Sequence, residues 1–230
     1  MPVNKEKYTQ IIGELAAKDV QLVAVSKLQS ISDIEKMYDL GQRDFGENYV
    51  QELIDKQEKL PKDIRWHFIG HLQRNKVKYI ASFIHLVQGV DSYSLLQEIN
   101  KEAHKANRKI HCLLQMHIAQ EETKFGLDEH ELDEIIQALI NTPALLSHIY
   151  ADGLMGMASF SDDMKRVSSE MEYLQKMFLK YRMQTGQFSA NKIPFTILSM
   201  GMSGDYKTAI EHGSNMVRIG SLLFGARTSK

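Results

Sequence analysis

The sequence has a single cysteine, four prolines and no excess of either charge. Cys112 alone cannot form an intramolecular disulfide, and it excludes a cysteine-rich metal site. Lys and Arg number 28 against 29 Asp and Glu, so the net charge is -1 and no positive field gathers nucleic acid or anionic lipid. Uncharged stretches such as Tyr79–Val90 are far shorter than the ~20 apolar residues of a membrane span. The segment Met1–Lys7 lacks the apolar core of a signal peptide. These absences predict a cytoplasmic protein that binds neither nucleic acid nor membranes.

No proline-rich linker or change in composition divides the chain, because its prolines are scattered at positions 2, 61, 143 and 194. Hydrophobic residues make up 43% and charged residues 25%, as in ordinary globular domains. We therefore expect one domain over residues 1–230, which is long enough for a large single core.

Short apolar runs alternate with segments of helical periodicity. In the longest of these segments, apolar residues recur every three or four positions between Met164 and Tyr181. Such a stripe is compatible with a coiled coil, but it is short for one, and a helix covering a sheet explains it better. The apolar runs predict eight strands, at 21–26, 44–46, 65–69, 83–87, 110–118, 149–155, 195–198 and 215–219.

Eight strands alternating with helices indicate an α/β protein with a parallel sheet. The strands are apolar almost throughout, which favours burial on both faces. We therefore predict a single (β/α)8 TIM-type barrel, close to the lower limit of size for that fold. An open doubly wound sheet is the alternative, although no G-x-G-x-x-G motif follows the first strand.

In such a barrel the functional site lies where the carboxyl ends of the strands meet. Lys27 follows the apolar run Leu22–Val25, so its amine is expected in the barrel mouth. Burial there lowers the pKa of a lysine and favours the neutral amine that forms a Schiff base. The alternative is a lysine that reaches past the rim into water.

Two loops rich in glycine and serine follow the last two predicted strands, Ser199–Ser203 and Gly220-Ser221. Barrels often bind phosphate between these two loops, although ordinary turns use the same residues. Arg218 lies two residues before Gly220, so both positions should point into the barrel. The Arg218 side chain could there face a ligand nitrogen, neutralise a phosphate or pair with a carboxylate. A Schiff-base lysine beside a phosphate site fits pyridoxal phosphate, or a phosphosugar handled by a lyase or aldolase.

The nine histidines do not suggest a metal site. His67 and His71 are four residues apart, but the predicted strand end and Gly70 separate them, and no H-E-x-x-H motif occurs. We therefore predict no bound metal. His71 is expected either to contact a ligand or to be a satisfied residue of the rim.

Five segments together resemble the pyridoxal phosphate homeostasis protein family over essentially the whole chain: Val23–Lys27, Phe45–Glu52, Trp66–Lys76, Leu198–Ser203 and Val217–Arg227. The resemblance implies a barrel like the N-terminal domain of alanine racemase, with pyridoxal phosphate as cofactor. It implies that Lys27 forms the Schiff base with the cofactor and that Arg218 faces the pyridine nitrogen of the cofactor ring. It also implies pocket positions that bind phosphate or line the ring, namely Ser199, Gly220, Ser221, Asn48 and His71.

The resemblance further implies a protein that buffers or supplies pyridoxal phosphate, with apoenzymes that require this cofactor as possible partners. We also expect a monomer. The alternative is a racemase-type enzyme on the same barrel. The sequence ends at Lys230, soon after the eighth predicted unit, where racemases carry a second β-rich domain, and this favours the homeostasis function. Departures from the family pattern at Leu28, Gln29, His117 and Gly156 concern the rim of the site.

Overall fold

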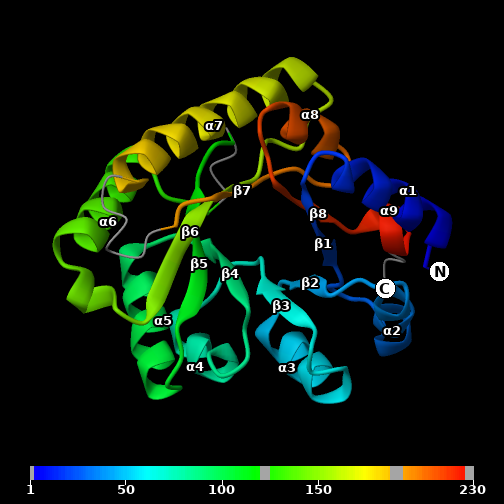
Figure 1. Ribbon diagram of the computed structural model, residues 1–230, viewed down its shortest axis with the longest axis horizontal. Coiled ribbons are helices and arrows are strands. Elements are labelled where there is room, and N and C mark those ends of the chain that lie inside the picture. The colour runs from blue at the N-terminus through cyan, green and yellow to red at the C-terminus, as the bar shows by residue number, and fades with distance from the viewer. Residues whose placement is uncertain (1–2, 120–124, 187–193, 226–230) are drawn as a thin grey trace.

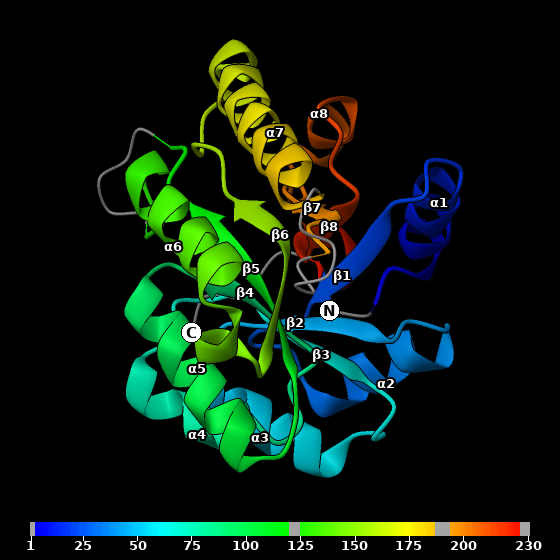
Figure 2. The ribbon, with the colours of Figure 1, turned by 60° about the vertical axis from the view of Figure 1, so that its left-hand side comes forward.

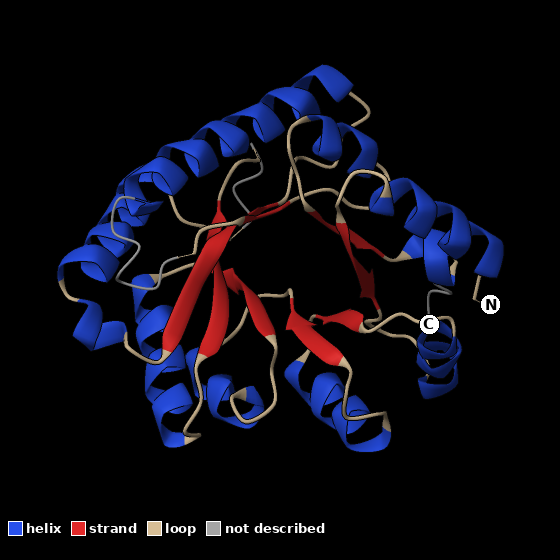
Figure 3. Cartoon of the chain, in the orientation of Figure 1, coloured by secondary structure: helices blue, strands red, loops and turns tan. Residues whose placement is uncertain are grey.

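Eight parallel strands close into a barrel in the computed structural model, which describes residues 3–119, 125–186 and 194–225. Each strand pairs with its neighbours in the sequence, and β1 also pairs with β8, which closes the ring seen in Figure 3. The predicted barrel is therefore confirmed. The strands are β1 (Gln21–Val25), β2 (Asp44–Glu47), β3 (Arg65–Phe68), β4 (Leu86–Val90), β5 (Ile110–Met116), β6 (Ile149–Gly156), β7 (Ile197–Ser199) and β8 (Met216–Ile219).

Helices surround the barrel, and α1 packs against α9 where the two ends of the described chain meet (Figure 1). In the described residues no helix is both long and apolar enough to cross a membrane. The helices are α1 (Lys5–Ala16), α2 (Ile31–Asp39), α3 (Val50–Lys59), η1 (Arg74–Lys76), α4 (Val77–Ile80), α5 (Tyr93–Lys105), α6 (Glu129–Asn141), η2 (Pro143–Leu146), α7 (Met164–Gly186), α8 (Tyr206–Glu211) and α9 (Ser221–Phe224).

The apolar residues form two separate cores. The larger core fills the space between the strands and the helices. The smaller one fills the inside of the barrel with one side chain from each of five strands: Val23, Leu86, Leu113, Met155 and Met216. Both faces of the strands are therefore covered, which explains why their sequences are apolar almost throughout.

Helix α7 carries the predicted apolar stripe and lies between α6 and α8 (Figure 2). Its buried residues include Val167, Met171, Leu174 and Phe178, and the helix packs on β6. The apolar stripe therefore packs on the sheet, as predicted, and does not form a coiled coil.

Two predicted strands are displaced. The fourth begins at Leu86 rather than at Phe83, because the amides of Phe83 and Ile84 bond back to the carbonyl of Ile80 and extend the turn after α4. The seventh begins at Ile197 rather than at Phe195, whose φ of +38° is incompatible with a strand.

Candidate functional site

Lys27 lies in a tight turn at the carboxyl end of β1, and it is partly buried. The next residue, Leu28, has a φ of +63°, which is uncommon for a residue other than glycine. The Leu28 N–H donates to Oε1 of Glu52 on α3, 2.6 Å away. This bond helps to hold the turn and therefore the position of the Lys27 backbone.

A buried ionic network lies behind this turn. Oε1 of Glu47 accepts from Oγ of Ser26 at 2.5 Å and from Nζ of Lys56 at 2.7 Å. Lys56 also donates to the Ser26 carbonyl and to Glu52. Burial raises the pKa of Glu47, and the charge of Lys56 opposes that shift. Sequence reasoning missed this network, although the i,i+4 spacing of Glu52 and Lys56 on a helix was a visible signal.

Arg218 on β8 is buried inside the barrel, with only 3% of its surface exposed. Its Nη1 donates to Oγ of Ser199 at 2.7 Å and its Nη2 to the carbonyl of Gly156 at 2.9 Å. Burial lowers the pKa of Arg218 to about 10, and the charge of Asp205 opposes that shift. No carboxylate in the described part of the chain lies within ion-pair distance, so the ion-pair alternative finds no support there. A buried guanidinium with donors to spare is suited to an acceptor atom of a ligand.

A chain of side-chain hydrogen bonds continues from Ser199 through the barrel. Ser199 Oγ donates to Oε1 of Gln88 on β4 at 2.7 Å. Nε2 of Gln88 lies 3.0 Å from Nδ1 of His67, and Nε2 of His67 lies 3.0 Å from Oδ1 of Asp44. The sequence analysis missed Gln88, and its only signal was an amide in an otherwise apolar run.

The loops after β7 and β8 meet through Ser203 and Gly220. The Gly220 N–H donates to Oγ of Ser203 at 3.3 Å. A Cβ on Gly220 would lie 3.3 Å from both Cβ and the carbonyl oxygen of Val25 on β1, so the backbones approach closely here. Because the Ser199 hydroxyl is engaged inside the barrel, Ser203 provides the side-chain hydroxyl next to Gly220. Ser221 is exposed at the start of α9.

Asn48 and His71 lie beyond the ends of β2 and β3. Oδ1 of Asn48 is buried and has no hydrogen-bond partner among the described residues. Nδ1 of His71 lies 2.7 Å from Oδ2 of Asp91, and its ring stacks on Phe125 with the ring centres 4.0 Å apart. His71 is therefore a partnered rim residue that still has one ring nitrogen to offer a ligand.

A surface pocket of roughly 610 Å³ contains Asn48 and His71, together with Tyr49, Lys76 and Tyr79. Among the described residues that line it, none is Lys27, Ser199 or Arg218. The structure thus brings the predicted residues together as two groups, Ser199 with Arg218 and Asn48 with His71. Strand β1, which leads to Lys27, lies between β8 and β2 and therefore between these groups.

Comparison with known proteins identifies the family to which this chain belongs. Residues 6–228 match the model of the alanine racemase N-terminal domain. The pyridoxal phosphate homeostasis protein of Pasteurella multocida is 34% identical over 215 residues, which are 90% of this chain and 87% of that protein. The protein of that name from Schizosaccharomyces pombe is 32% identical, over 96% of this chain and 90% of the relative.

Solved structures give the same result. PipY of Synechococcus elongatus, in a structure with PLP bound, is 30% identical and has a TM-score of 0.83 over 96% of this chain and 99% of its own. Alanine racemase of Bartonella henselae, with covalently bound pyridoxal phosphate, shares the fold at 16% identity, with a TM-score of 0.66 over 98% of this chain and 60% of its own. An eight-stranded barrel with this motif order, matched over nearly its full length, belongs to the pyridoxal phosphate homeostasis protein family.

Proposed function

We propose that this protein binds pyridoxal phosphate as a Schiff base on Lys27 and serves to buffer or supply the cofactor. The observation that carries the proposal is the placement of Lys27 in the turn at the carboxyl end of β1. This strand lies next to β8, which carries the buried cation Arg218 and leads into the close-packed Gly220 loop. The Lys27 amine, the Arg218 guanidinium and the backbone N–H groups of the Gly220 loop therefore lie toward the same end of the barrel.

The residues fit the chemical groups of pyridoxal phosphate one by one. When bound, the cofactor supplies an aldehyde for the lysine amine and a conjugated ring that can accept electrons. Arg218 has guanidinium donors left for the ring nitrogen, and backbone N–H groups near Ser203 and Gly220 suit the phosphate. The orphaned Oδ1 of Asn48 needs a donor, which a polar group of the ligand or an ordered water would provide.

The relatives above, which are named for homeostasis, favour that function over racemase-type catalysis. A guanidinium that donates to the ring nitrogen opposes protonation of that atom, which weakens the ring as an electron sink. Racemases of this type share such an arginine, so Arg218 is consistent with either function. We further propose that the protein acts in the cytoplasm as a monomer and passes cofactor to apoenzymes.

The experiment is absorbance spectroscopy of the protein loaded with pyridoxal phosphate, before and after borohydride, followed by peptide mapping. We expect Schiff-base absorbance that borohydride removes, with the reduced adduct on Lys27. Lys27→Arg should lose this absorbance, while the matched control Lys76→Arg, which alters the neighbouring pocket, should keep it. An adduct on another lysine would overturn the assignment, and absence of any binding would overturn the proposed function.

A further inference from the structure

The end of the barrel opposite Lys27 holds a row of histidines between two aspartates. Asp44, His67, His85, His111 and Asp152 come from five neighbouring positions around the barrel, on β2, β3, the residue before β4, β5 and β6. The rings of His67 and His85 are 5.4 Å apart, and those of His85 and His111 are 6.2 Å apart. The proposed cofactor function uses none of these side chains directly.

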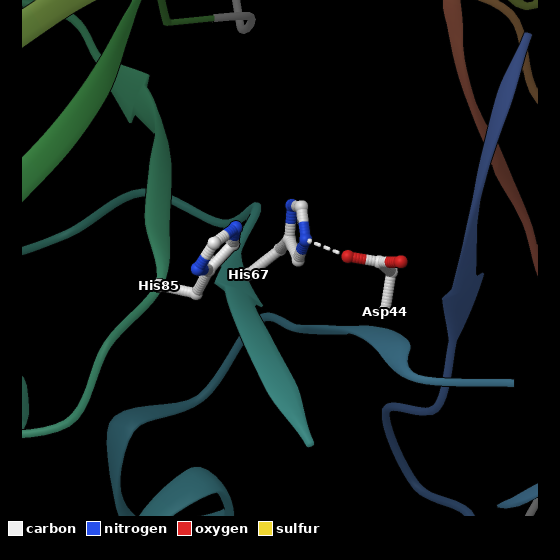
Figure 4. A group of neighbouring side chains, drawn as sticks. All are labelled: Asp44, His67 and His85. Carbon is white, nitrogen blue, oxygen red and sulfur yellow. Dashed lines mark hydrogen bonds and ion pairs between the residues drawn. The ribbon is translucent and has the colours of Figure 1, made fainter. Parts of the chain in front are cut away.

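Three of these residues converge most closely. One oxygen of Asp44 and one nitrogen each of His67 and His85 all lie within 4.8 Å of one another. Figure 4 shows His67 between the other two side chains, with its hydrogen bond to Asp44. In a tetrahedral zinc site with bonds of 2.0–2.1 Å, ligand atoms are about 3.4 Å apart. The Asp44–His67 distance of 3.0 Å is close to this value, and the limit of 4.8 Å for all three atoms leaves only a small movement to reach it.

We propose that Asp44, His67 and His85 bind a divalent transition-metal ion such as Zn²⁺. Imidazole and carboxylate ligands together suit this class of ion, and three protein ligands leave a position for water. The ion would replace the proton now shared between Nε2 of His67 and Asp44. His85 is exposed and makes no side-chain hydrogen bond to any described residue, so it is free to turn toward the ion and gives it an entry path.

The surrounding residues act on this site in two directions. Arg65 donates from Nε to Oδ1 of Asp44 at 2.8 Å and from Nη2 to Oδ2 at 2.5 Å. These bonds orient the carboxylate, as outer-shell partners of metal ligands do, but the charge of Arg65 repels a cation. Asp152 pairs with His111 at the other end of the row, where its Oδ2 lies 2.6 Å from Nδ1 of His111 and its buried Oδ1 lacks a partner among the described residues.

The sequence predicts no metal, because the histidine spacings within any one segment match no metal motif. These three ligands are instead separated by 23 and 18 residues, and only the closed barrel brings them together. His67 was considered with His71, but these two residues lie in separate clusters, at Asp44 and Asp91 respectively.

The test is calorimetric titration of the purified full-length protein with Zn²⁺, together with visible absorbance after addition of Co²⁺. We expect one ion per chain, and an absorbance spectrum typical of Co²⁺ with a low coordination number. His85→Ala should weaken binding by roughly tenfold or more, without loss of the folded circular dichroism spectrum, because the side chain is exposed.

The matched control is His148→Ala, because the exposed pair of His148 and His104, with ring nitrogens 3.1 Å apart, is another place where an ion could bind. Binding that is lost in His148→Ala and kept in His85→Ala would overturn the proposal. Absence of Zn²⁺ binding in the wild-type protein would overturn it as well. None of these readouts depends on pyridoxal phosphate.

Discussion

Nη1 of Arg218 donates to Oγ of Ser199 across a distance of 2.7 Å, and this contact joins the last two strands inside the barrel. The resemblance had placed Ser199 at the phosphate. The structure gives its hydroxyl to Arg218 and Gln88, so its side chain positions the arginine. We therefore expect the phosphate to rely on Ser203 and on backbone N–H groups.

Gln88→Leu should destabilise the protein by about 1–3 kcal/mol, because it leaves the buried Ser199 hydroxyl without its acceptor and Nδ1 of His67 without its partner. The same change should weaken pyridoxal phosphate binding, since the Ser199 hydroxyl that accepts from Arg218 is no longer held in place by Gln88. Urea unfolding and a binding titration measure the two effects. The control is Gln97→Leu, an exposed position on α5. Unchanged stability and affinity in Gln88→Leu would contradict the positioning role.

Gly220→Val should weaken binding of pyridoxal phosphate much more than binding of pyridoxal, which lacks the phosphate. The added Cβ meets Val25 at 3.3 Å and forces the loop away from the ligand. Gly13→Val is the control, since a Cβ there has nothing within 4 Å. Parallel titrations with the two ligands provide the comparison. Equal losses for both ligands would mean that the phosphate is bound elsewhere.

Lys56→Met should cost about 3–5 kcal/mol, because it leaves the Glu47 carboxylate buried without its cation. It should also reduce Schiff-base absorbance, since the turn that carries Lys27 loses part of its support. Adding Glu47→Gln should restore part of the stability, and a double-mutant cycle by urea unfolding measures this coupling. Lys59→Met, exposed on the same helix, is the control. Additive effects of the two changes would show that the pair is uncoupled.

The stability of the protein should fall in acid, partly because the Asp44 carboxylate becomes protonated. Burial would raise the pKa of Asp44, but hydrogen bonds from Arg65 and His67 outweigh burial and hold that pKa well below its usual range. The ionised carboxylate therefore stabilises the fold above the unfolded pKa of about 3.9, and this contribution is lost as the pH falls toward the folded pKa. Asp44→Asn should cost about 1.5–3 kcal/mol at pH 7 and less at pH 3. Urea unfolding at both pH values tests this, and a cost that does not change with pH would refute it.

We expect negligible turnover of L- and D-amino acids by the loaded protein, together with release of cofactor to a competing apoenzyme. The relatives at 32% and 34% identity are named for homeostasis, and buffering requires only reversible binding. A substrate panel and a transfer assay measure the two activities. Turnover near the ~10 s⁻¹ typical of enzymes would favour the racemase alternative.

The closed barrel was predictable because apolar strands buried on both faces leave a strong pattern, and most strand ends were placed within a residue or two. The fourth strand was misplaced because Phe83 and Ile84 are apolar but belong to a turn that packs on the core. The polar contacts inside the barrel were harder to predict. Whether Ser199 faces a phosphate or Arg218 depends on side-chain directions around a closed ring, which a linear pattern does not contain.

The hydrogen bonds from Arg218 through Ser199, Gln88 and His67 to Asp44 also mean that the two mouths of the barrel are not chemically independent. Each donor in this series fixes the orientation of the next group, so a proton or ion gained at Asp44 changes what His67 can offer to Gln88. A change of side-chain direction could then pass along the barrel axis without any movement of the strands. The end of the barrel that carries Asp44 is thus linked through three side chains to the arginine at the other end.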